Sequence, residues 1–107
     1  MNELVQRLSE GTDEVEASLH SDPSAARLKE RIDLGFIQIK FTETQGGTVL
    51  GVRLDPAAVD LSRADFNTGS GTVRLEGSLT LNYQKVRCRA EIDLATLKGT
   101  GLLIPFD

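Results

Sequence analysis

Three residues with oxygen-bearing side chains have the spacing of a calcium-binding loop in DFNTGSGTVRLE, the segment that begins at Asp65. Asp65, Asn67 and Glu76 occupy the first, third and twelfth places, which supply carboxylate and amide oxygens to Ca²⁺. Two departures count against a site, because Gly69 stands at the fifth place and Ser70 replaces the glycine of the sixth. We therefore predict no metal and no cofactor, and these three residues remain the weak metal candidates.

The single histidine and the single cysteine, His20 and Cys88, stand apart from other chemistry-bearing groups. We expect His20 at the end of a helix, where a cation suits the helix dipole. Cys88 alternates with Arg87 and Arg89, and strand alternation points these arginines to the opposite face. Cys88 is thus expected to be a small buried hydrophobe. No catalytic residue is predicted, so enzymatic activity is left open and a non-catalytic protein is favoured.

The composition is that of a folded domain rather than a disordered or fibrous chain. The chain has 107 residues, of which 39% are hydrophobic and 26% charged, and one domain spanning residues 1–107 is expected. A net charge of −4 and an absence of Trp disfavour nucleic acid as a partner. The sequence has neither a signal-peptide pattern at its start nor an apolar stretch of membrane-spanning length. We therefore expect a cytoplasmic protein with no membrane partner.

The first part of the chain, residues 1–31, is predicted to be an acidic helical segment. Residues 1–22 contain six acidic side chains against Arg7 alone. Leucine and valine residues recur at helical spacing, and Gly11 stands at the one position in this series that has no apolar side chain. A second short helix is expected over SAARLKER, residues 24–31.

The remainder, residues 32–107, alternates with a period of two and is predicted to form antiparallel strands. Near Gly35 the alternation of apolar and polar residues changes phase, and a glycine-assisted bulge at this residue would explain the change. The clearest hairpin places odd-numbered side chains from Val73 to Tyr83 and even-numbered ones from Val86 to Leu94 on one interior face, with the turn near residues 84–85. Residues 55–66 fit a helix and a strand equally well.

The predicted fold class is α+β, with one or two N-terminal helices packed on a curved, mainly antiparallel sheet of about five or six strands. The alternative is a small β-barrel with an N-terminal helix, because glycines within the strands would help them to bend.

Polar side chains on the outer face of these strands are the candidate interaction residues. Basic residues outnumber acidic ones there, which suits an acidic partner, and the acidic N-terminal helix of a neighbouring copy meets that description. The interaction residues predicted on these grounds are Glu14, Glu16, Lys40, Arg53, Arg74, Arg87 and Arg89.

The segment RIDLGFIQIKF, which follows the amphipathic helices, resembles small bacterial domains that co-occur with trypsin-like proteases in conflict systems. The resemblance ends near Leu54, and it implies no function or site residue for this chain.

The leading hypothesis is a non-catalytic protein–protein interaction or accessory module. It would self-associate, as a homo-oligomer, through the acidic N-terminal helix and the sheet edge or polar face. The alternative is a small-molecule or lipid-binding β-barrel or cup, including a barrel-type cyclase that shapes its substrate.

Overall fold

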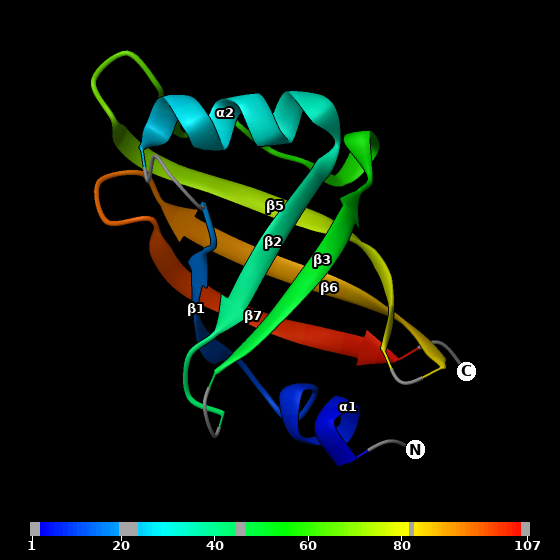
Figure 1. Ribbon diagram of the computed structural model, residues 1–107. Coiled ribbons are helices and arrows are strands. Elements are labelled where there is room, and N and C mark those ends of the chain that lie inside the picture. Colours follow the sequence, from blue (N-terminus) through cyan, green and yellow to red (C-terminus); the bar gives the residue numbers. More distant parts are fainter. Residues whose placement is uncertain (1–2, 20–23, 45–46, 82, 106–107) are drawn as a thin grey trace.

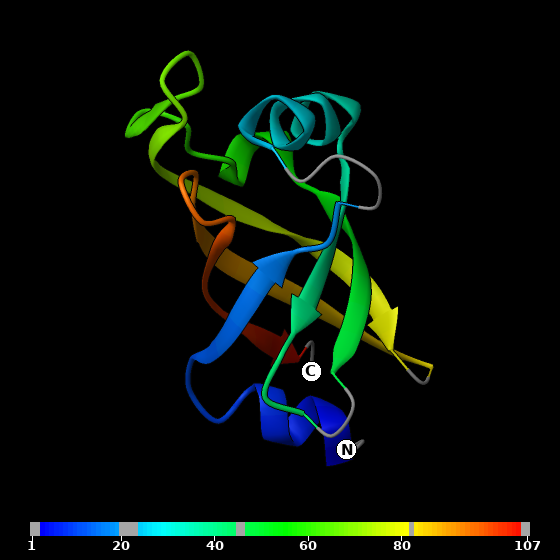
Figure 2. The same cartoon turned by 60° about the vertical axis from the view of Figure 1, so that its left-hand side comes forward.

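The computed structural model describes residues 3–19, 24–44, 47–81 and 83–105, which form a closed antiparallel β-barrel with a helix at each end (Figures 1 and 2). Each strand of the ring pairs with two neighbours, and the pairing of β3 with β5 closes it. The curved sheet expected from the sequence therefore closes on itself, so the alternative of a small β-barrel describes it better. The strands of the ring are β1 (Asp13–Ala17), β2 (Phe36–Phe41), β3 (Thr48–Leu54), β5 (Ser70–Leu81), β6 (Gln84–Asp93) and β7 (Lys98–Pro105).

The interior of the barrel is filled by the chain's own apolar side chains. Barrels of about eight strands are just wide enough for side chains to fill, and this ring is narrower. Alternate residues of each strand point inward and are buried, as the period of two predicts. The largest fully buried side chains are Phe41, Leu8, Leu28, Ile37, Ile39, Leu75, Ile92, Leu103, Val15, Val52 and Val73.

The predicted hairpin is present as the pairing of β5 with β6, with Val73 opposite Ile92 and Leu75 opposite Ala90. The prediction was wrong at its tip. Strand β5 ends at Leu81 and β6 begins at Gln84, so the turn comes before residues 84–85. Tyr83 lies in this turn with φ of 69° and is fully exposed, because a residue in the left-handed region leaves the strand alternation.

Two helices cover the two ends of the barrel (Figure 1). The short helix α1 (Glu3–Leu8) buries Leu8 completely. Helix α2 (Ala25–Leu34) begins where the Ser24 hydroxyl accepts a hydrogen bond from the Arg27 N–H, at 3.2 Å. It ends at Gly35, whose φ of 81° is the left-handed conformation of a helix C-cap. The change of phase at Gly35 is thus the passage from helix to strand, and the predicted bulge is wrong.

The N-terminal segment differs from the predicted acidic helix. Gly11 has φ of 129°, the helix has already ended, and residues 13–17 form β1 between β2 and β7. Val15 and Leu19 are both buried, and a spacing of four residues is compatible with a helix and with a strand. The helical interpretation failed because a short strand of this kind has no distinctive period of its own. His20, predicted at a helix end, lies outside the described residues.

The ambiguous residues 55–66 contain both kinds of structure. A 3₁₀ turn, η1 (Pro56–Ala58), is capped by Asp55, whose Oδ1 accepts the Ala57 N–H at 3.0 Å. The two-residue strand β4 (Ala64–Asp65) then pairs with the start of β5 outside the ring. In the described part of the chain no helix combines the length and the apolar character that crossing a membrane requires.

Candidate functional site

The outer face of β5 and β6 carries a network of ion pairs centred on Glu76. Its Oε1 accepts a hydrogen bond from Arg89 Nε at 2.9 Å, and its Oε2 accepts one from Arg87 Nε at 2.9 Å. Arg87 Nη2 also lies 3.4 Å from Asp55 Oδ2. The Arg89 hydrogen bond is the main cause that lowers the pKa of Glu76, and Arg87 adds to it against the opposing effect of desolvation. Glu76 is therefore held as a carboxylate by two arginines.

This network lies over the seam at which the barrel closes. Strands β3 and β5 pair at two positions, Arg53 with Ser78 and Leu54 with Gly77. A side chain at Gly77 would place its Cβ 2.1 Å from the Arg53 carbonyl oxygen, so glycine permits the two strands to approach. Just beyond, the Asp55 N–H donates to the Glu76 carbonyl at 2.9 Å. The position of the ion pairs indicates a structural role in holding the seam together.

A surface depression of about 480 Å³ lies beside this network on the same outer face. Its charged lining alternates in sign, because Arg74 faces Glu91 and Glu76 faces Arg89 across the two strands. The arginines predicted to meet an acidic partner, Arg74, Arg87 and Arg89, therefore have carboxylate neighbours within their own chain. Opposite charges at such close range cancel most of the field that would attract a charged ligand.

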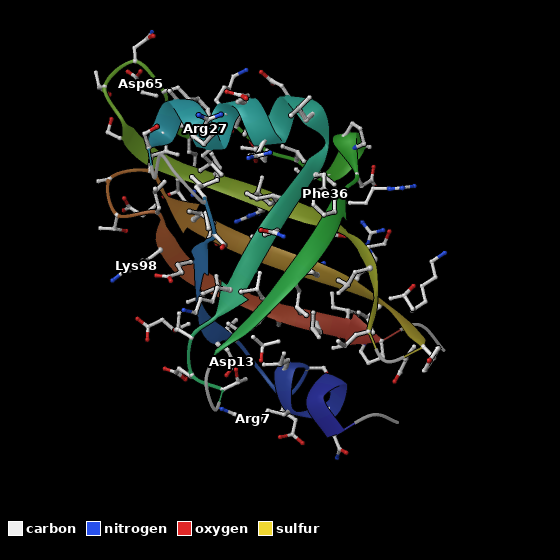
Figure 3. All side chains as sticks on the ribbon, in the orientation of Figure 1. Arg7, Asp13, Arg27, Phe36, Asp65 and Lys98 are labelled. Carbon is white, nitrogen blue, oxygen red and sulfur yellow. The ribbon has the colours of Figure 1, made fainter. Side chains whose placement is uncertain are left out.

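The three metal candidates do not come together. Asp65 Oδ1 accepts the backbone N–H groups of Asn67 and Thr68, at 2.9 and 3.3 Å, which forms a turn after β4. Figure 3 shows Asp65 beyond the end of the barrel, outside the ring of strands. Asp65 pairs with Ser70, and Glu76 lies roughly 20 Å further along β5. The described residues contain no group of three or more His, Cys, Asp or Glu side chains able to hold a metal ion.

Cys88 points into the barrel, as the alternation of β6 predicts. Its side chain is 2% exposed, and burial raises the pKa of the thiol to about 12. A thiol with such a pKa remains protonated at neutral pH and is a poor nucleophile. Arg87 and Arg89 lie on the opposite face, where they bind Glu76 instead.

The acidic residues Glu14 and Glu16 lie on the outside of β1, and not on a helix. Glu16 has Lys40 of β2 as its neighbour on one side and Lys98 of β7 on the other. Basic residues thus interrupt the acidic surface that was expected to meet a neighbouring copy. The interaction by way of an acidic helix loses its structural basis.

The edge of β3 beyond the seam has backbone groups that no described strand pairs with. Along this strand the N–H groups alternate in direction: Leu54 donates to Gly35 on the β2 side, and Asp55 donates to Glu76 on the β5 side. By this alternation, the N–H and C=O groups of Val49 and Gly51 point toward β5. The pairing with β5 starts only at Arg53, so the described part of β5 leaves these groups without a partner strand.

Exposed apolar side chains lie next to this open edge. Phe36 and Val49 are 49% and 48% exposed, and both lie on the outer face of the β2–β3 hairpin, where Figure 3 labels Phe36. The Phe36 ring covers Gly51, since a Cβ at Gly51 would lie 2.7 Å from the ring. Arg53 is exposed beside them and makes no ion pair with a described residue. We call Phe36, Val49, Gly51 and Arg53 the β3 edge site.

A depression of about 360 Å³ separates the β3 edge site from the hairpin of β5 and β6. It shows that the space beyond the edge is accessible from outside. The residues that line it are Phe36, Gly51, Arg53, Ser78, Leu79, Thr80 and Lys85.

Sequence reasoning found one residue of this site, Arg53, together with its neighbour Lys40. It missed Phe36, which directly follows the C-cap of α2 and is an apolar residue at an outward position of β2. Val49 carried a usable signal, since it is an apolar residue at an outward position in TVLGVRL. The open edge itself had no signal, because only the arrangement of strands decides which edge lacks a partner.

No protein-family model matches this chain, and no curated protein matches it either.

Proposed function

We propose that this protein is a non-catalytic protein–protein interaction module of the cytoplasm that self-associates through the β3 edge site. The single observation that supports this most is the open backbone edge of β3 with exposed Phe36 and Val49 beside it. Open strand edges with apolar neighbours pair readily with another strand, unless charged residues block them.

Other features of the barrel favour an interaction surface over a reaction or a carrier function. The chain's own side chains fill the interior, which favours this function over the binding of a lipid or small molecule inside the barrel. Cys88 is a buried thiol, and the carboxylate of Glu76 is bound by two arginines. These groups are used in packing and in closing the barrel. A free thiol in a chain with one cysteine also suits the reducing cytoplasm.

The test is the mass of the protein in solution as a function of its concentration. Light scattering or sedimentation equilibrium should show an average mass that rises above 11.6 kDa with concentration. Val49→Lys should reduce this rise, because a lysine on an edge strand opposes pairing with another strand. The side chain at this position is half exposed, so the substitution does not bury a charge.

Thr100→Lys is the matched control, since Thr100 is exposed on the outer face of β7 and the change in net charge is the same. This variant should associate as the wild type does. A protein whose mass stays monomeric at every concentration and salt would exclude the proposal, as would equal effects of the two substitutions.

A further inference from the structure

The open edge of β3 is complementary to itself. The N–H and C=O groups of Val49 and Gly51 point out of this edge, and a two-fold rotation brings the donors of one copy to the acceptors of another. We infer that β3 of one molecule pairs antiparallel with β3 of a second molecule, which joins the two sheets into one. A second copy is then the partner, and this pairing rests on the proposed function.

The seam between β3 and β5 limits the register of such a pairing. If Gly51 faced Gly51 of the second copy, Val49 would have to pair with Arg53, which is already paired with Ser78. Two nearby registers avoid this conflict. One sets Val49 opposite Val49 of the second copy, and the other sets Val49 opposite Gly51 with Leu50 of both copies at the two-fold axis.

The side chains favour the register with Val49 opposite Gly51. Because the Phe36 ring covers Gly51, Val49 of the second copy meets that ring, and symmetry makes this contact twice. Aromatic residues paired with β-branched residues across neighbouring strands stabilise antiparallel sheets. The contact covers the two side chains that are half exposed in the single molecule.

Like charges oppose this pairing only weakly, because the basic side chains concerned lie at the surface, where solvent screens them. Arg53 is the only charged residue in TVLGVRL, and in this register it lies just outside the paired residues 48–52 and keeps its pairing with Ser78. Its side chain comes near position 47 of the second copy, over which the Lys40 side chain of that copy lies. The two Arg53 side chains then stand roughly 20 Å apart along the ladder, further than the Debye length of about 8 Å at physiological ionic strength. The strands β2 and β3 contain no carboxylate, so the net charge of −4 is not concentrated there.

Amide hydrogen exchange measured by NMR at two protein concentrations tests the pairing without any substitution. The amides of Val49 and Gly51 should exchange more slowly at the higher concentration, by about tenfold when nine-tenths of the protein is paired. The amides of Leu50 and Val52 point to β2 and should be protected equally at both concentrations. Protection that rises at alternate residues is the signature of a strand added at this edge.

Cross-linking of the Val49→Cys variant tests the register. The thiol of Cys88 is buried, so it should not react and should add no cross-linked product. In the inferred register the two introduced thiols lie on a diagonal, about 7–8 Å apart. A bifunctional thiol reagent of that span should join the copies, whereas oxidation alone should not, because a disulfide needs Cβ atoms about 4 Å apart. Thr100→Cys on β7 is the control and should not be cross-linked.

The outcomes separate this inference from the proposed function. A direct disulfide in Val49→Cys would overturn the register. Association without slower exchange at Val49 and Gly51 would overturn the pairing of β3 while self-association stands. If the mass never depends on concentration, both fall, and any use of this edge belongs to a different protein.

Discussion

Glu76 is the residue whose ion pairs bear most directly on the closure of the barrel. Its side chain is 19% exposed and that of Arg87 26%, so solvent screens this pair only in part. The hydrogen bond to Arg87 is therefore worth about 1–2 kcal/mol, and the one to the half-exposed Arg89 less than about 1 kcal/mol. We expect Glu76→Gln, which keeps one acceptor oxygen but loses the charge, to lower the free energy of unfolding by about 1–2 kcal/mol at neutral pH.

The effect should depend on pH with a defined sign. Arg89 and Arg87 lower the pKa of Glu76 in the folded protein from the ordinary value of 4.5. A depressed carboxylate pKa stabilises the folded state above the unfolded-state pKa, and this contribution is lost as the pH falls through the folded-state pKa. The difference between the wild type and Glu76→Gln should hence be complete above pH 4.5 and shrink below it.

Urea denaturation at neutral and acidic pH, followed by circular dichroism, measures this difference. Glu91→Gln is the matched control, because Glu91 lies on the same face, is 48% exposed and approaches Arg74 only to 3.9 Å. It should change the free energy of unfolding by less than about 0.5 kcal/mol. Equal costs for the two substitutions, or a Glu76→Gln cost that does not vary with pH, would refute the assignment of Glu76 to the seam.

Two further predictions concern the seam and the interior. Gly77→Ala should destabilise the fold by about 1–3 kcal/mol in urea denaturation, because its Cβ meets the Arg53 backbone, whereas Gly51→Ala should cost less, since it meets only the end of the movable Phe36 ring. Equal costs would contradict the close approach of β3 and β5. Cys88 should resist a thiol reagent in the native protein and react once the protein unfolds, because its pKa is about 12 and it is buried. Rapid native labelling would show that β6 is not oriented as described.

The strands with long alternating patterns were predictable from the sequence. Val73, Leu75, Cys88 and Ile92 occupy the interior as expected, because a period of two directs alternate side chains to opposite faces whatever the rest of the fold does. The outward position of Arg53 was predictable for the same reason. Short segments were not predictable, because the spacing of Val15 and Leu19 fits both a helix and a strand. The segment forms a strand because it pairs with β2 and β7 in the barrel.

The sequence by itself determined which faces of the long strands are apolar. It also determined that the single cysteine lies on one of these apolar faces. Only the tertiary structure decided that the sheet closes, that the outward arginines Arg87 and Arg89 of β6 bind Glu76, and that no described strand covers the edge of β3 beyond the seam. The physical reason is that side-chain alternation is a local property of one strand. Closure, ion pairing and edge exposure depend instead on which strands become neighbours, and residues far apart in the chain settle that together.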